Sequence, residues 1–167
     1  MPPKLRASLL TASLLVLAVS GVAVAKTSDR KQPTNIEADQ GQMSTKDDTP
    51  SILDGNVSVV QGTMTAKGAH GTVWSRKGKA YRMLMTGSPV VLTEILDDGS
   101  PMKATAANVD YNLDTDIAVF TGNVVITQPK GTLNSEKVTY NMKTGTVNSG
   151  GGPGQRVHMV LQPKSGA

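Results

Sequence analysis

A segment that recurs along the chain constrains the fold more than any other feature of the sequence. Gly-Asn-Val occurs at residues 55–57 and again at 122–124, and the residues after each copy realign with a two-residue insertion, Pro129-Lys130. A third start, Gly-Ser-Pro-Val at 87–90, lies between them, so the starts are 32 and 35 residues apart. A period of this size marks one supersecondary unit, which repeats because it cannot bury its apolar face alone. The repeat therefore predicts stacked β units joined by turns.

Apolar and polar residues alternate with period two in much of the chain after residue 25, and no sustained helical stripe occurs there. The alternation is clearest over 107–113, and it recurs over 137–142 and 156–162. Such alternation is typical of strands with one apolar face. The Ala-rich segment 103–107 runs into the clearest alternation, so we expect it to be strand.

Turn residues separate these runs at short intervals. Glycine, asparagine and aspartate have the permissive backbone that hairpin-type connections need. We expect such connections at Asp54-Gly55, Gly78, Asp97-Asp98-Gly99, Thr121-Gly122-Asn123 and Lys143-Thr144-Gly145. Many short strands joined in this way predict an all-β sandwich, roll or barrel, built from repeated antiparallel hairpins.

The first 25 residues have the three-part layout of a secretory signal peptide. Lys4 and Arg6 form a short basic start, and residues 9–19 are an almost unbroken apolar run. Ala23-Val24-Ala25 supplies the small residues of a cleavage site. The alternative is an uncleaved membrane anchor over 7–25, a length that just spans a bilayer. We expect cleavage after residue 25, and hence an exported protein.

One domain accounts for most of the chain after the signal peptide, since the remaining length is that of a single domain. We expect a flexible lead-in over 26–34, a single β domain over 35–163 and a short tail over 164–167. The first strand of the domain is expected at 35–39.

A glycine-rich run separates the last strand from the rest of the domain. Residues 150–154 offer almost no side chains for packing, so we expect a hinge there. The strand predicted at 155–162 is then loosely tied to its own chain. A terminal strand of this kind is a candidate for pairing with another chain.

Charge and cysteine content argue against several classes of partner and linkage. Without residues 1–25 the chain has 15 basic and 13 acidic residues. A net charge of +2 gives no electrostatic case for a nucleic-acid partner. The chain has no cysteine, so no disulfide supports the fold. No apolar run after residue 25 approaches membrane-spanning length.

No pattern in the sequence indicates catalysis, a metal site or a cofactor. His70 and His158 are the only histidines, and neither has a partner at a ligand-forming spacing. No glycine-rich loop leads from a strand into a helix, so a phosphate-binding loop is unsupported. We therefore expect a protein that binds and does not catalyse.

Four basic residues surround Gly78: Arg76, Lys77, Lys79 and Arg82. One interpretation is a solvated hairpin tip. The other is a rim that contacts an anionic head group, and the sequence alone is compatible with both.

The apolar faces contain few aromatic rings and many methionines. Aromatic residues are 3% of the chain, and seven methionines come after Met1. Rings dominate the burial of tightly packed cores, whereas methionine adapts to irregular apolar partners. Two interpretations are therefore open. Either two sheets enclose a dry core, or they stay apart and their apolar lining receives acyl chains.

A set of short motifs occurs in one order along residues 32–163. The set comprises Gln32-Pro33, Ile36-Glu37-Ala38-Asp39, Gly55-Asn56-Val57 with Gln61-Gly62-Thr63, Gly87-Ser88-Pro89, Val109-Asp110-Tyr111, Phe120-Thr121-Gly122-Asn123-Val124 and Arg156-Val157. Each motif alone is weak. The ordered set at these spacings closely resembles the OstA-like family of periplasmic lipopolysaccharide-transport proteins of Gram-negative bacteria.

The resemblance implies both a fold and a function. The family fold is a twisted antiparallel β-jelly roll, open at both ends, whose apolar interior shields the acyl chains of lipid A. Copies join head to tail, and a contact that does not close on itself generates a filament. The implied partners are lipopolysaccharide, other copies of the chain, an LptC-like inner-membrane protein and an LptD-like outer-membrane translocon. The implied role is that of a periplasmic carrier and bridge in outer-membrane assembly.

The resemblance, carried onto the alternating strands, selects residues for two roles. The residues expected to line the lipid groove are Ile36, Val57, Val59, Leu92, Val109, Tyr111, Leu113, Val124, Ile126, Val138 and Tyr140. The edge residues expected to join copies are Ile36, Ala38, Val157, Met159 and Leu161. The assignment of Leu92 depends on strand register, because a one-residue slip would turn its side chain outward.

Two alternatives to the carrier remain at this point. An LptC-like member of the same pathway would keep residues 7–25 as its anchor. A structural β-repeat module would have a dry core and no lipid cargo.

Overall fold

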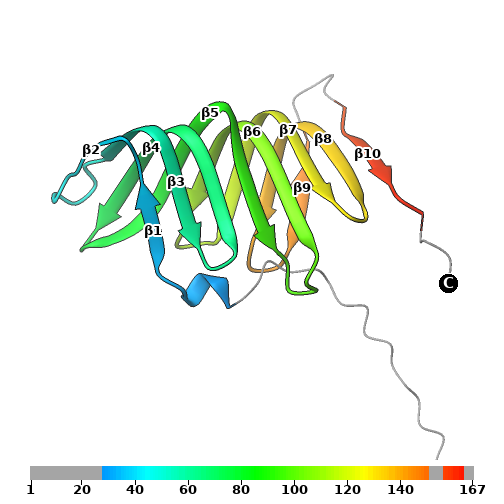
Figure 1. Cartoon of the computed structure of the whole chain (residues 1–167), viewed down its shortest axis with the longest axis horizontal. Coiled ribbons are helices and arrows are strands. Elements are labelled where there is room, and N and C mark those ends of the chain that lie inside the picture. Colours follow the sequence, from blue (N-terminus) through cyan, green and yellow to red (C-terminus); the bar gives the residue numbers. More distant parts are fainter. Residues whose placement is uncertain (1–27, 151–155, 164–167) are drawn as a thin grey trace, which may run out of the picture.

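The computed structural model of the chain describes residues 28–150 and 156–163, which form one antiparallel sheet (Figure 1). The predicted signal peptide 1–25, most of the glycine run (151–154) and the tail 164–167 lie outside those ranges. The elements are the 3-10 helix η1 (Asp29–Lys31) and the strands β1 (Thr34–Glu37), β2 (Gln40–Gln42), β3 (Ser51–Gln61), β4 (Met64–Arg76), β5 (Lys79–Ile95), β6 (Pro101–Asn112), β7 (Ile117–Gln128), β8 (Gly131–Asn141), β9 (Thr146–Ser149) and β10 (His158–Leu161). No helix within the described ranges is long and apolar enough to cross a membrane.

The six long strands β3 to β8 pair in chain order and arch over, so that the sheet has two arms (Figure 1). Four short strands complete the arms at the two ends. β1 pairs with the C-terminal half of β3 and β2 with its N-terminal half. β10 pairs with the N-terminal half of β8 and β9 with its C-terminal half. We call the two arms the β1–β10 arm and the β2–β9 arm.

The register of pairing breaks between the two arms of every neighbouring pair of long strands. The breaks lie between Asp54 and Val57, Lys67 and His70, Thr86 and Val90, Thr105 and Asn108, and Thr121 and Val124. Extra residues at such β-bulges bend a strand and increase its twist. A column of aligned bulges therefore accounts for the two arms.

The predicted hairpin turns at Asp54-Gly55 and Thr121-Gly122-Asn123 are wrong, because both segments lie inside a long strand at a bend. The glycine and the asparagine have φ of 76° and 45° at 55–56, and of 81° and 49° at 122–123. These two residue types tolerate this left-handed backbone better than others. The third start, 87–90, occupies the bend of β5. One period of the repeat is thus a pair of bent strands.

The hairpin turns predicted at Gly78, 97–99 and 143–145 are confirmed. They connect β4 to β5, β5 to β6 and β8 to β9. The Ala-rich segment 103–107 lies in β6, as its alternation predicted.

The outermost segments differ from the prediction in extent and attachment. β1 covers Thr34–Glu37 in place of 35–39, and the described part of the lead-in contains η1. β10 covers His158–Leu161, within the predicted 155–162, of which residue 155 is not described. β10 makes four residue pairs with β8, so this strand is docked on its own chain.

Candidate functional site

The residues predicted to line a groove lie on the inner side of the bent sheet. Eight of the eleven are buried: Val57, Val59, Leu92, Val109, Val124, Ile126, Val138 and Tyr140. Tyr111 and Leu113 are partly buried and pack against the same core. Ile36, on the edge strand β1, is 39% exposed. At 3% exposed, Leu92 has the inward register on which its assignment depended.

Several other side chains of this core were not among the residues selected from the sequence as groove lining. They include Met64, Met83, Met85, Met102, Met142 and Phe120. The inward phase changes at the bend of β5, because Met83 and Met85 face inward before it and Val90 and Leu92 after it. An uninterrupted period of two therefore fails over the whole strand. The high methionine content signalled the methionines only as a group, and the alternation over 137–142 signalled Met142.

Described side chains from both arms pack around a small cavity in the interior of the roll. One cavity of about 30 Å³ lies between the arms, lined mainly by methionines, aliphatic residues and Tyr111. A volume of this size holds no more than one or two water molecules. This cavity therefore admits an acyl chain only if the arms move apart or the lining repacks.

A buried carboxyl group and a tyrosine join the two arms across the interior. Tyr140, on the β2–β9 arm, donates from Oη to Oε1 of Glu94, on the β1–β10 arm, at 2.9 Å. Glu94 is 5% exposed, and burial raises its pKa to about 7. Burial also raises the pKa of Tyr140. We call this pair the brace.

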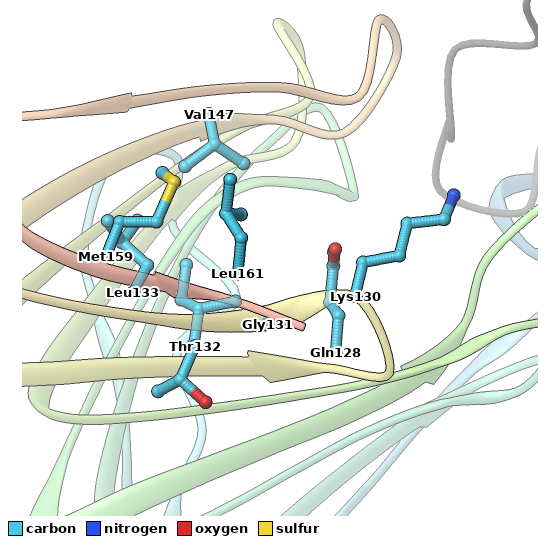
Figure 2. A pocket seen from close by; sticks show the side chains of 9 residues that line it. Gln128, Lys130, Gly131, Thr132, Leu133, Val147, Met159 and Leu161 are labelled. Atoms are coloured by element: carbon cyan, nitrogen blue, oxygen red, sulfur yellow. The ribbon is translucent and has the colours of Figure 1, made fainter. Parts of the chain in front are cut away.

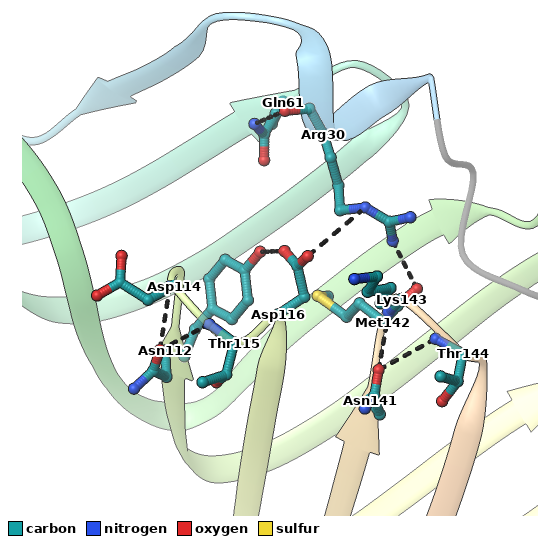
Figure 3. A network of polar contacts seen from close by, with 11 residues as sticks. Arg30, Gln61, Asn112, Asp114, Thr115, Asp116, Asn141, Met142, Lys143 and Thr144 are labelled. Atoms are coloured by element: carbon teal, nitrogen blue, oxygen red, sulfur yellow. Dashed lines mark hydrogen bonds and ion pairs between the residues drawn. The ribbon is translucent and has the colours of Figure 1, made fainter.

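The helix η1 contacts the free ends of both arms. Asp29 accepts hydrogen bonds from Thr63 N, at 2.8 Å, and from Thr63 Oγ1, in the β3–β4 turn of the β1–β10 arm. Figure 3 shows Arg30 reaching the other arm, where Nη1 donates to Met142 O at 2.6 Å. Its Nε lies 3.9 Å from Asp116 Oδ2. Polar contacts of η1 therefore span the open side of the roll.

The basic cluster lies around the β4–β5 hairpin turn, and two of its four members are in ion pairs. Arg76 Nη2 lies 2.7 Å from Asp48 Oδ1, and Arg82 Nη2 lies 2.6 Å from Asp110 Oδ2. Lys77 and Lys79 are exposed at the turn. The ion pairs favour the solvated hairpin tip, and contact with an anionic head group stays a prediction.

The exposed large apolar side chains of the described ranges gather at the two ends of the sheet. At the end formed by β1, β2 and β3 they are Ile36, Met43 and Ile52. At the end formed by β9 and β10 they are Val147, Val157, Met159, Val160 and Leu161. Ala38, predicted as an edge residue, is only partly exposed and packs against the core.

A groove of about 150 Å³ lies at the β9–β10 end, between the two arms. Figure 2 shows Val147 of β9 facing Met159 and Leu161 of β10 across this groove. Leu133 of β8 lies at its base, and the charged Lys130 lies at its rim. The interior of the roll thus ends in an apolar opening on this side.

The described parts of the chain contain no cluster of three or more histidine, aspartate, glutamate or cysteine residues that could hold a metal ion. His70 Nδ1 contacts Asp54 Oδ1 on the neighbouring strand. His158 is exposed on β10.

Comparison with known sequences matches this chain to one family. A family model described as "LptA/(LptD N-terminal domain) LPS transport protein" matches residues 35–146. The chain is 32% identical over 162 residues to the lipopolysaccharide export system protein LptA of Escherichia coli strain K12, covering 96% of this chain and 86% of that protein. It is 27% identical over 157 residues to the lipopolysaccharide export system protein LptH of Pseudomonas aeruginosa, covering 89% of each.

A solved structure has the same fold. It is the crystal structure of LptH, described as the LptA-homologous periplasmic component of the lipopolysaccharide transport device of Pseudomonas aeruginosa. It superimposes with a TM-score of 0.74 at 26% identity, covering 81% of this chain and 99% of that chain. The predicted all-β jelly roll is therefore confirmed. Because the family model matches more than half of the sequence, the chain belongs to the LptA/LptD N-terminal domain family of lipopolysaccharide transport proteins.

Proposed function

We propose that the chain is a periplasmic carrier that shields the acyl chains of lipopolysaccharide inside the bent sheet. The observation that carries the proposal is one continuous apolar face, shared by β3 to β8 and enclosed between the two arms. Burial of acyl chains is non-directional, so such an interior holds them without catalytic groups. The relatives named lipopolysaccharide export system proteins support the same cargo.

Loading of the interior requires a rearrangement, since the cavity between the arms is only about 30 Å³. Methionines from both arms line that cavity: Met64 from the β1–β10 arm, and Met83 and Met85 from the β2–β9 arm. Methionine has three rotatable bonds and fills irregular apolar space. The lining can therefore repack around an acyl chain as the arms separate.

The two ends of the sheet are suited to joining copies head to tail. β1 and β10 complete one arm, and β2 and β9 complete the other. The β9–β10 end of one copy, set on the β1–β2 end of the next, continues both arms. Such stacking also covers the exposed apolar side chains at each end. The resulting bridge extends the interior toward an LptC-like inner-membrane protein on one side and an LptD-like outer-membrane translocon on the other.

Export by a cleaved signal peptide places the carrier in the periplasm. The mass of the protein purified from the periplasm tests this step. A mass equal to that of a chain starting at residue 26 supports the carrier. Recovery of the protein in the membrane fraction with residues 1–25 retained would favour the LptC-like alternative.

Two neighbouring substitutions test the cargo site. Tyr111 packs against the interior, and Asn112 is the next residue on β6 with the opposite orientation. We expect Tyr111→Asp to weaken lipopolysaccharide binding by the purified protein about tenfold or more, because it places a charge in the acyl site. Asn112→Asp leaves binding unchanged. Equal effects of the two changes would refute the assignment of the inner face.

A further inference from the structure

We infer that residues 28–32, with η1 at their centre, are a strap that holds the two arms together across the open side of the roll. An acyl chain enters the interior through this open side when the strap leaves. The inference rests on the proposed function and goes beyond it, because it assigns control of access to a segment that contributes no lining residue.

The strap is fastened to the β1–β10 arm by two residues of the β3–β4 hairpin. Thr63 donates to the carboxylate of Asp29 from both its amide and its hydroxyl. Gln61 Nε2 donates to the carbonyl oxygens of Gln32, at 3.1 Å, and Arg30, at 3.4 Å. Gly62 lies so close to Asp29 that a Cβ on this glycine would overlap the carboxyl group. The hairpin is therefore shaped to receive the strap.

Arg30 fastens the strap to the β2–β9 arm. Arg30 donates to Met142 O, and it also faces the carboxylate of Asp116. The side chains of Arg30 and Asp116 are 20% and 25% exposed, so the pair is sheltered from water. Position 30 thus contacts a residue 112 positions later in the chain.

The contact of Arg30 with Asp116 is connected to Tyr111, a residue predicted to line the cargo site. Tyr111 Oη donates to Asp116 Oδ1 at 3.2 Å, and Asp116 in turn faces Arg30 (Figure 3). An acyl chain that displaces the ring of Tyr111 also disturbs the partner of Arg30. Cargo and strap therefore compete through one carboxylate.

The strap can leave without exposing a buried apolar side chain of its own. η1 contains no buried residue, and hydrogen bonds and an ion pair hold it to the arms. Water replaces such contacts when the strap leaves, whereas an apolar lid would have to be wetted. The arms then lose one of their links and keep the brace between Glu94 and Tyr140. A polar strap of this kind opens and closes reversibly.

Substitutions in the strap test the inference by the rate of lipopolysaccharide uptake. The probe is fluorescent lipopolysaccharide mixed with purified protein that begins at residue 26. We expect Arg30→Ala and Asp29→Ala to accelerate uptake at least about threefold, because each raises the population of the open state. Lys31→Ala is the matched control, since Lys31 is an exposed residue of the same helix. An unchanged uptake rate in both Arg30→Ala and Asp29→Ala would overturn the inference that the strap controls access.

A tether provides the opposite test, and the absence of native cysteines makes it specific. Lys31→Cys with Lys143→Cys keeps Arg30 and allows a flexible bismaleimide to fix the strap to the β8–β9 turn. We expect the tethered protein to take up the probe at least about tenfold more slowly than the same variant without the reagent. Equal rates would overturn the strap while leaving the carrier intact. Failure of the untethered wild type to bind the probe would instead overturn the proposed function.

Discussion

The two ends of the sheet have the same arrangement of short strands and differ in the side-chain contacts that hold them. At each end two short strands complete the two arms, β1 and β2 on β3, and β9 and β10 on β8. The β1–β2 end is also held by side chains, through Asp29, Arg30 and Gln61. No side-chain hydrogen bond or ion pair of the described residues fastens β10, which is held by its backbone pairing with β8.

The difference indicates a division of labour. Apolar side chains left exposed in a group mark a surface that contacts a partner, and β10 presents Met159, Leu161 and Val160 of this kind, with Val157 just before it. The β1–β2 end exposes the smaller apolar group Ile36, Met43 and Ile52, and the polar contacts of η1 beside it close the open side. The β9–β10 end therefore presents the larger surface for a partner, and the β1–β2 end combines a smaller contact surface with closure of the open side.

The largest effect is expected at the β9–β10 end. Met159→Asp combined with Leu161→Asp places two charges in the apolar surface of β10. We expect association of copies to weaken about a hundredfold or more, since charges in such a contact remain unpaired. Sedimentation velocity over a range of concentrations measures it. Val119→Asp, at a partly exposed residue of β7, is the control. Unchanged association of the double variant would contradict the assignment of the β9–β10 end as a contact surface between copies.

The next effect concerns pH and the region beneath the strap. Glu94 faces Tyr140, and Asp29, Arg30 and Asp97 also act on its charge. Its pKa rises on folding from 4.5 to about 7. The folded state therefore binds this proton more tightly than the unfolded state does. The stabilisation is present below pH 4.5 and is lost as pH rises through 7, by about 3 kcal/mol in total.

Urea unfolding at pH 5 and pH 8 checks this dependence. Glu94→Gln cannot titrate and keeps an amide oxygen that can accept from Tyr140. We expect the wild type to lose about 2–3 kcal/mol more than this variant between the two pH values. Parallel losses in both proteins would show that Glu94 is not the group responsible.

A smaller effect on stability distinguishes the packing of Asp29 against Gly62 from the backbone strain of the β3–β4 turn. Gly62 and Gly78 both have left-handed φ, of 60° and 72°, in hairpin turns. A Cβ at Gly62 meets Asp29, whereas at Gly78 it meets nothing within 4 Å. Both alanine variants carry backbone strain of about 1–2 kcal/mol. We expect Gly62→Ala to lose about 1–2 kcal/mol more in thermal unfolding because it also displaces Asp29; equal losses would argue against a close fit of the strap.

The smallest effect is expected on the stability of the monomer when an exposed side chain of β10 is shortened. Leu161 is 72% exposed, so Leu161→Ala removes little that the monomer buries. We expect its unfolding free energy at low protein concentration to change by less than about 0.5 kcal/mol. A loss of several times that value would mean that β10 stabilises the monomer more than its exposure indicates.

The residues of the inner face at the start of each repeat could be predicted from the sequence, whereas the bends within the strands could not. Val57 and Val124 come directly after the Gly-Asn pairs, and their inward placement was predicted from the family resemblance carried onto the alternating strands. The pairs themselves were taken for hairpin turns because a two-residue hairpin of type I′ also needs two residues with positive φ. A bulge inside a strand and a turn between strands can thus use the same local chemistry. Only the long-range pairing of β3 with β4 distinguishes them.

The strap could not be predicted for a related reason. Residues 28–32 have no periodicity, and they are polar, so composition indicates a loose segment. Their order comes from partners that are distant in the sequence, Thr63 for Asp29 and Met142 for Arg30. Such contacts leave no local pattern, because each partner is an ordinary turn residue.

Site-specific photo-crosslinking in cells tests whether acyl chains lie between the arms. A photo-reactive residue at Tyr111 or Val124 projects into the interior, and one at Asn112 projects outward from the same strand as Tyr111. We expect crosslinks to lipopolysaccharide at Tyr111 and Val124 and none at Asn112. Capture at all three positions alike, or at neither of the two inner ones, would contradict this placement of the acyl chains.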